Sequence, residues 1–322
     1  MASQIDLKQL NLVASPHIKA RATTQHIMIM VCISLLPLCV NGVILFGIPA
    51  LITLAVSVVS CVVFEWVAQK LLKKPVAIQN GSAVVTGLLL ALVVSPVTPV
   101  WMIILGAFFA IVIGKEFFGG IGSNVFNPAL IGRGFMVLSF AAAMGTWVTP
   151  VDAISTATVL ATLKTGDTSF VTSDYFQLFI GNQAGTIGET SAMLILIAAV
   201  FLLITKIIDW RAPLAMTATV AILTFFSGAD VLAHLLSGGL LFGAVFMTTD
   251  YTTAPVTAWG RVIFGFGCGL ITFLIRQFGG LPEGVMFSIL IMNAFTPFLN
   301  KIIGRKAGEP RKTLFKKSPG GV

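Results

Sequence analysis

Two long stretches of the sequence carry no charged side chain, and they constrain the fold more than any motif. Residues 22–64 and 75–114 contain no Asp, Glu, Lys or Arg. Each is far longer than the roughly 20 apolar residues that cross a bilayer as one helix. Only 10% of the 322 residues are charged and 57% are hydrophobic, whereas about 25% of residues are charged in a soluble domain. The sequence therefore predicts an all-α polytopic membrane protein.

Ten apolar segments can be recognised along the chain. They cover residues 26–46, 49–71, 80–95, 99–114, 124–143, 190–208, 212–227, 231–247, 258–277 and 283–303. Ten crossings place both termini on the same side of the membrane. That side is predicted to be the cytoplasm, because cytoplasmic loops collect Lys and Arg, and it then holds Lys70, Lys73, Lys74, Lys115, Lys206 and Arg211. Arg276 alone falls clearly on the opposite side.

The net charge of +8 does not indicate a nucleic-acid partner. Seven of the twenty basic residues lie between Lys301 and Lys317, directly after the last apolar segment. This is the placement expected of a cytoplasmic tail next to a lipid surface. We expect a multi-pass membrane protein whose partner is the bilayer and not a nucleic acid.

The spacing of the segments predicts five regions. A cytoplasmic N-terminal segment (1–25) has no evident cleavage site and is expected to be retained. Residues 26–143 and 190–303 form two membrane repeats of five segments each, an odd number that makes the repeats inverted relative to each other. Residues 144–189 form an extracytoplasmic loop, and residues 304–322 a basic cytoplasmic tail.

Several predicted spans are short or broken. Residues 80–95 would rise only ~24 Å as a helix, less than the ~30 Å of the hydrocarbon core. Residues 230–247, interrupted by Gly238 and Gly239, are predicted to be their counterpart. Short, glycine-broken segments at matching places in two repeats indicate a binding site between the repeats, near the middle of the membrane.

The extracytoplasmic loop contains Asp152-Ala-Ile-Ser155-Thr-Ala-Thr158. A hydroxyl flanked by small residues on an exposed loop is accessible to a modifying enzyme. A tether through that hydroxyl would also keep a soluble cofactor at high effective concentration. As an isolated heptapeptide, the same residues are equally consistent with ordinary polar loop sequence.

This heptapeptide resembles the pattern D-x-x-[ST]-[GA]-A-T, at which flavin mononucleotide (FMN) is attached through its phosphate. Most of the chain, residues 10–310, also resembles one family of membrane subunits. It includes the D subunit of the Rnf ferredoxin:NAD oxidoreductase and the B subunit of the sodium-pumping NADH:quinone reductase. The motifs that carry the resemblance are residues 80–87, 114–129, 246–255, 283–287 and 292–297. The short N-terminal segment favours the Rnf branch.

The resemblance implies a flavoprotein. Thr158 would carry the covalent FMN, with Asp152 and Ser155 as recognition residues for a flavin transferase that uses FAD and magnesium. Thr156 departs from the pattern, which usually has glycine there. The resemblance further implies a noncovalent riboflavin, a urea-transporter-like fold and, as partners, the other members of the complex. The expected function is electron transfer coupled to export of sodium or protons.

Three polar residues are candidates for the riboflavin site. Asn124 and Asn127 lie in a glycine-rich break before Pro128, and Asp250 follows another apolar segment. Polar groups buried in a membrane protein are functional candidates because their burial is costly. Capping of a helix or segment end is an equally good interpretation of all three.

Other charged residues are expected to have plain structural roles. Lys115, Glu116 and Glu283 lie at predicted segment ends, where capping or snorkelling to the interface is usual. Arg133 is expected to reach the cytoplasmic headgroups. The four cysteines all lie in apolar runs without C-x-x-C spacing and the three histidines are scattered, so we expect no metal site.

Two alternatives to the Rnf-type protein remain open at this stage. One is the B subunit of a sodium-pumping NADH:quinone reductase. The other is a urea-transporter-like solute channel without redox function, since an inverted repeat with broken helices also describes transporters. A channel would have no use for a tethered flavin, so the presence of covalent flavin discriminates between the classes.

Overall fold

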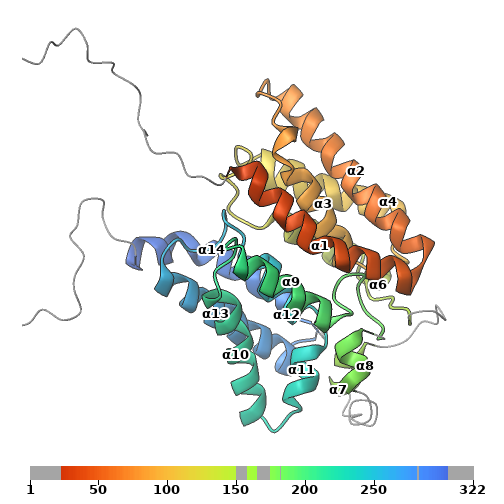
Figure 1. Cartoon of the computed structure of the whole chain (residues 1–322), viewed down its shortest axis with the longest axis vertical. Coiled ribbons are helices and arrows are strands. Elements are labelled where there is room, and N and C mark those ends of the chain that lie inside the picture. Colours follow the sequence, from red (N-terminus) through yellow and green to blue (C-terminus); the bar gives the residue numbers. More distant parts are fainter. Residues whose placement is uncertain (1–22, 150–157, 165–174, 182, 281–282, 304–322) are drawn as a thin grey trace, which may run out of the picture.

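A computed structural model describes residues 23–149, 158–164, 175–181, 183–280 and 283–303 (Figure 1). Within these residues every element is helical, which confirms the all-α prediction. The elements are α1 (Thr24–Phe46), α2 (Ile48–Leu71), η2 (Ile78–Asn80), α3 (Ser82–Leu92), α4 (Val100–Phe108), η3 (Phe109–Glu116), α5 (Pro128–Ser139), α6 (Ala141–Met144), α7 (Val159–Lys164), α8 (Tyr175–Ile180), α9 (Ala192–Ile204), α10 (Arg211–Phe226), α11 (Val231–Leu236), α12 (Leu240–Phe242), η4 (Gly243–Met247), α13 (Ala258–Phe278) and α14 (Val285–Ile303).

Each of the ten predicted apolar segments contains a helix. Among the described residues, four helices, α1, α2, α13 and α14, are long and apolar enough to cross a membrane by themselves. Shorter apolar helices are α3, α5, α9 and α10. The prediction of a multi-pass membrane protein is thereby confirmed.

The short and broken segments are also where the sequence predicts them. Helix α3 has only eleven residues, and the 231–247 segment is divided among α11, α12 and the π-helical η4. The division falls at Gly238, whose φ of +67° is a conformation that favours glycine. The element η3 is also π-helical. Such wide turns inside helices frequently mark functional sites.

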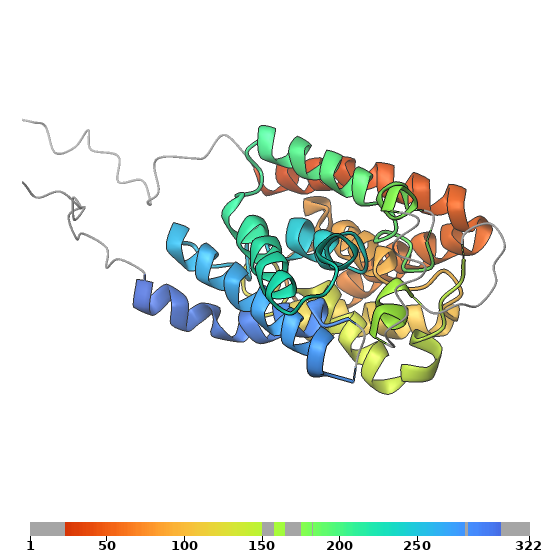
Figure 2. The same ribbon diagram turned by 90° about the horizontal axis from the view of Figure 1, so that it is seen from below.

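The helices form two sets that lie side by side. In Figure 1, α1–α4 occupy one side of the molecule and α9–α14 the other, and the view in Figure 2 shows α9 running along α1. In order along the chain, α2, α4 and α5 of the first set correspond to α10, α13 and α14 of the second. In the first set α4 packs against α2 and α5, and in the second set α13 packs against α10 and α14. This agreement supports the repeat, whose boundaries and inversion stay predictions.

Small residues let the helices within each set approach closely. A Cβ on Gly87 of α3 would lie 2.7 Å from Val58 Cα of α2, and one on Gly265 of α13 would lie 2.4 Å from Ala212 O of α10. Both distances are shorter than any real carbon contact. Glycine at these positions allows the backbones to pack in van der Waals contact, which is how membrane helices associate without a hydrophobic driving force.

Candidate functional site

Thr158 is the first described residue after a gap, and it directly precedes helix α7. Its carbonyl accepts hydrogen bonds from the backbone N–H of Ala161 at 2.8 Å and of Thr162 at 3.0 Å. Among the described residues, its hydroxyl accepts one long hydrogen bond, 3.4 Å, from Ala161 N–H. The side chain is half-buried, and the backbone carbonyl ties the residue to the first turn of α7. The two other predicted motif residues, Asp152 and Ser155, lie outside the described residues.

Thr158 lines a cavity that we call the Thr158 cavity. Its other lining residues come from the predicted extracytoplasmic loop and from the breaks before α12 and α14: Trp147, Val159, Leu160, Gln183, Ala184, Gly185, Thr186, Glu189, Thr190, Ser237, Gly238 and Glu283. A larger apolar cavity of about 310 Å³ shares Trp147 and Glu283 with it and is also lined by Met144, Met286 and Phe287. The two cavities therefore adjoin.

A buried ionic network lies between these cavities. Arg133 Nη1 is 3.1 Å from Glu189 Oε1, and Arg133 Nη2 is 2.9 Å from Glu283 Oε2. We call these three residues the Arg133 network. The expectation that Arg133 reaches the headgroups is wrong, because its side chain is only 8% exposed and faces carboxylates of the second half of the chain. Glu283, expected to be a cap or to snorkel, accepts from the backbone N–H of Gly239 at the start of α12 with Oε1 and binds Arg133 with Oε2.

Burial changes the acidity of Glu189, which lies just before α9. Desolvation raises its pKa to about 8, and the neighbouring Glu283 carboxylate contributes in the same direction. The contact with Arg133 lowers the pKa, but one guanidinium serves two carboxylates here. The site therefore favours a proton on Glu189 near neutral pH.

Arg276 is the base that the positive-inside pattern leaves on the wrong side. Its side chain is buried, at 5% exposure. It donates to the carbonyl oxygens of His234 at 2.6 Å and Ser237 at 3.4 Å. These carbonyls lie where α11 ends, so Arg276 satisfies backbone groups freed by the broken span. Arg276 therefore has a structural role inside the protein, which explains why it departs from the preference of basic residues for cytoplasmic loops.

The three candidate riboflavin residues lie in one place. Asn124, Asn127 and Asp250 all line a second cavity, which we call the Asn cavity. Its wall also includes Met28, Val31, Ser82, Val85, Thr86, Leu89, Lys115, Phe246, Thr249, Tyr251 and Thr252. The cavity is bounded by residues of both helix sets, as expected for a site between two repeats.

Each of the three residues also has a structural role. Asn127 Oδ1 caps α5 by accepting from Ala129 N–H at 3.1 Å. Asn124 Nδ2 donates to Thr252 Oγ1 at 2.7 Å and so joins the loops of the two sets. Asp250 accepts from Thr252 and Thr253, and burial raises the pKa of its carboxyl group. The capping interpretation is confirmed for Asn127, and the common cavity leaves a ligand role open to all three.

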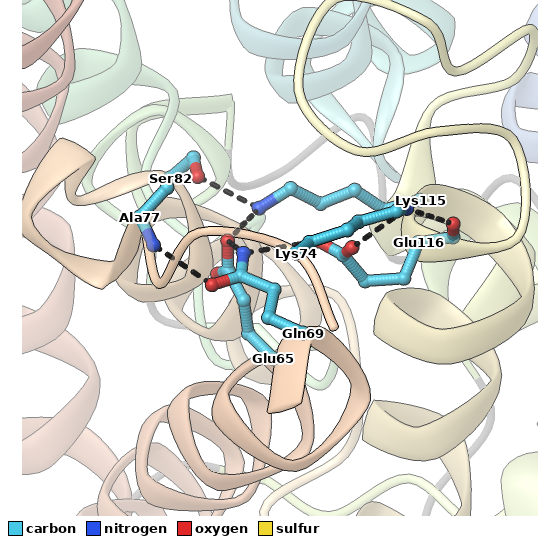
Figure 3. A network of polar contacts seen from close by, with 7 residues as sticks. All are labelled: Glu65, Gln69, Lys74, Ala77, Ser82, Lys115 and Glu116. Carbon is cyan, nitrogen blue, oxygen red and sulfur yellow. Dashed lines mark hydrogen bonds and ion pairs between the residues drawn. The ribbon is translucent and has the colours of Figure 1, made fainter. Parts of the chain in front are cut away.

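A second buried ionic network adjoins the Asn cavity (Figure 3). Lys115 Nζ lies 2.7 Å from Glu65 Oε1 and 2.7 Å from Ser82 Oγ. Glu116 accepts from Lys74 at 3.5 Å and from Gln69 at 3.3 Å, and Gln69 also donates to Glu65 at 3.0 Å. We call these six residues the Lys115 network. The expectation that Lys115 and Glu116 snorkel is wrong, since they are 3% and 2% exposed.

Sequence reasoning missed Glu65, Glu189 and the role of Lys115. A usable signal existed, because Glu65 follows an uncharged stretch of 43 residues (22–64) and Lys115 follows one of 40 (75–114). An acid and a base that each end such a stretch can be expected to pair. The partner of Arg133 carries no such signal, since Glu283 lies 150 residues away.

Comparison with known proteins identifies the family. Residues 11–308 match the model of the NQR2, RnfD, RnfE family. The chain is similar to the D subunit of the Na(+)-translocating ferredoxin:NAD(+) oxidoreductase complex of Acetobacterium woodii, with 44% identity over 301 residues that cover 92% of this chain and 94% of the relative.

Two further relatives have related names. The D subunit of the proton-translocating ferredoxin:NAD(+) oxidoreductase complex of Clostridium ljungdahlii is 41% identical over 93% of this chain and 96% of its own length. The D subunit of the ion-translocating oxidoreductase complex of Stutzerimonas stutzeri is 37% identical over 89% and 92%. With a family model matched over most of its length and relatives this similar, the chain belongs to the NQR2, RnfD, RnfE family.

Proposed function

We propose that this chain is the membrane electron-transfer subunit of an ion-translocating ferredoxin:NAD(+) oxidoreductase complex. The names of relatives that align over nearly their whole length carry this proposal. One relative is named for sodium and another for protons, so the proposal covers either ion. The partners are the other membrane and peripheral subunits of such a complex.

We further propose that Thr158 carries FMN through a phosphoester, made by a flavin transferase that recognises Asp152 and Ser155. The surroundings of Thr158 fit such a group. Arg133 Nε and Thr190 Oγ1 are buried without a hydrogen-bond partner among the described residues, and each lines one of the two adjoining cavities. Unsatisfied buried polar atoms are costly, and a polar ligand would supply partners.

The apolar cavity beside Thr158 fits the ring of a tethered flavin. Trp147 and Phe287 provide flat apolar surface, while Arg133 provides donors at the rim. A bound flavin would supply one- and two-electron transfer, which no side chain of this protein supplies. The protein's share of the work is to hold the ring at a fixed place and to exclude water from it.

The Asn cavity is the proposed site of a noncovalent riboflavin. Asn127 Nδ2 donates to no described residue, while its Oδ1 is occupied by the cap. Asn124, Asp250 and Thr249 add polar groups to a wall that is otherwise apolar. A site with a few directed polar groups in an apolar wall suits a flat heteroaromatic ring with one polar edge.

The covalent attachment is tested by in-gel fluorescence of the denatured polypeptide, made together with a flavin transferase. The wild-type band should fluoresce under ultraviolet light, and Thr158→Val should abolish the signal. Thr162→Val is the matched control, because Thr162 is another hydroxyl of α7 and its loss should leave the band fluorescent. A dark wild-type band would rule out covalent flavin. It would also leave a solute channel without redox function as an equally good interpretation.

The riboflavin site is tested by the flavin that acid releases from the purified complex. Asp250→Asn should lower the released riboflavin several-fold without changing in-gel fluorescence. Asp209→Asn is the control, since Asp209 lies on the neighbouring loop but does not line the Asn cavity. Equal riboflavin in both variants would contradict this assignment.

The proposed orientation has the termini in the cytoplasm and Thr158 outside. Ser169→Cys introduces a thiol into the predicted extracytoplasmic loop. An impermeant thiol reagent should label it in intact cells. Of the native cysteines, Cys39, Cys61 and Cys268 are buried, so background labelling should be low. Labelling that requires permeabilised cells would reverse the orientation.

A further inference from the structure

Lys115 is a buried lysine with an unused hydrogen-bond donor. Its side chain is 3% exposed. An ammonium group has three N–H donors, and two of them bind Glu65 and Ser82 (Figure 3). Within the described part of the chain Lys115 forms no third hydrogen bond, and Glu65 Oε2 is likewise without a partner there. A buried donor of this kind is costly unless it meets a partner.

The position of Lys115 indicates what that partner is. Lys115 and Ser82 both line the Asn cavity, together with the polar candidates Asn124, Asn127 and Asp250. The wide π-helical turns of η3 carry Lys115, and its long side chain reaches Ser82 at the start of α3. A molecule in the Asn cavity would therefore have the lysine ammonium as part of its wall.

We propose that Lys115 is the positioning residue that stabilises the reduced, negatively charged form of the flavin in the Asn cavity. This inference rests on the riboflavin site proposed above. Two-electron reduction with uptake of one proton leaves one negative charge on the flavin ring. A positive charge next to the ring stabilises that product relative to the neutral oxidised ring. The effect is strong because the surroundings have a low dielectric constant.

The other charges around Lys115 determine the direction of each change. Glu65 binds the ammonium directly at 2.7 Å and so weakens its effect on the cavity. Asp250 is the acid of the cavity wall. Lys74 and Glu116 pair with each other at 3.5 Å in the same network, but neither lines the cavity. Removing Lys115 and removing Glu65 are therefore expected to have opposite effects.

The test is a redox titration of the purified complex with dithionite as reductant, followed by visible absorbance. Lys115→Met should lower the equilibrium constant for reduction of the noncovalent flavin at least tenfold, which is a shift of ~30 mV to lower potential for a two-electron couple. Glu65→Gln should shift it to higher potential. Lys115→Arg, which keeps the charge, should stay near the wild-type value.

The controls separate a charge effect from a folding effect. Lys74→Met removes a lysine of the same network that is 32% exposed, and it should leave the potential unchanged. A merely structural role for Lys115 would not give opposite shifts in Lys115→Met and Glu65→Gln. Should Lys115→Met fail to assemble, Glu65→Gln and Lys115→Arg still decide the question.

The inference and the riboflavin proposal fail in different ways. Riboflavin bound in the Lys115→Met complex with an unchanged potential would overturn the role of Lys115. An unchanged or lowered potential in Glu65→Gln would overturn it as well. A wild-type complex that releases no riboflavin on acid treatment would instead overturn the proposed flavin site.

Discussion

The two buried ionic networks differ in what they connect. In the Arg133 network, Arg133 of α5 binds Glu189 and Glu283, which are 56 and 150 residues away in the second half of the chain. In the Lys115 network every charged residue belongs to the first helix set, and Lys115 and Glu65 are 50 residues apart. The first network joins the two sets, whereas the second stiffens one of them.

The networks also differ in charge balance. The Lys115 network pairs two lysines with two glutamates. In the Arg133 network one guanidinium binds two carboxylates directly, and Arg276 acts on them only from farther away. Burial, together with the neighbouring Glu283 carboxylate, raises the pKa of Glu189. A network with equal numbers of paired acids and bases keeps its charges fixed when the pH changes. A network with more paired carboxylates than bases can take up a proton, so its contribution to stability depends on pH.

The largest effect is expected from Arg133→Met. The substitution removes the common partner of Glu189 and Glu283 and breaks the ion pair of the Glu283 carboxylate. Breaking a buried ion pair by removing one partner costs about 3–5 kcal/mol. We therefore expect a large drop in the melting temperature of the purified complex. The melting temperature is measured by size-exclusion chromatography of samples heated to a series of temperatures. Lys74→Met should cost no more than ~1 kcal/mol, since that pair is partly exposed. Equal losses in the two variants would remove the distinction between the networks.

A smaller effect is expected from Glu65→Leu. This substitution leaves a single buried ammonium group, that of Lys115, without its carboxylate. Because Lys115 keeps Ser82 as a partner, we expect a loss of about 3 kcal/mol in the free energy of unfolding. The double variant Glu65→Leu/Lys115→Met should regain most of this loss, because replacing both partners removes the unpaired charge. The readout is the same melting temperature. Additive losses would show that the two residues do not act as a pair.

The sequence predicts the scaffold better than the networks. Uncharged runs, short segments and glycine breaks are local signals, so the ten segments and the broken span at Gly238 could be predicted. Asn124, Asn127 and Asp250 could be predicted as one site because buried polar groups in membrane segments are rare. The pairing of Arg133 with Glu283 could not be predicted, since it depends on how the two helix sets dock. The usual rule for charges at lipid-facing segment ends fails where protein covers the end of the segment.

The raised pKa of Glu189 predicts a pH dependence of intermediate size. Its folded-state pKa of about 8 exceeds the ordinary 4.5, so the folded protein holds a proton that the unfolded chain releases. Stability should therefore fall as pH rises from about 4.5 to about 8. Glu189→Gln, which mimics the protonated side chain between Arg133 and Glu283, should flatten this part of the melting-temperature profile. An unchanged slope would assign the dependence to another group.

The smallest effect is expected from a third cluster of charged residues, which is partly exposed to solvent. Asp209 binds Arg211 and Arg261, each at 2.7 Å, but the two arginine side chains are 37% and 32% exposed. Burial raises the pKa of Asp209, but the hydrogen bonds from both arginines outweigh this and lower the pKa below 3.8. The triad thus adds stability that is present above that pH and lost as the pH falls through the lowered pKa.

Asp209→Asn should cost no more than ~1 kcal/mol at pH 7 because solvent screens the pairs. A loss as large as that of Arg133→Met would mean that charge pairing, and not burial, decides the strength of all three clusters.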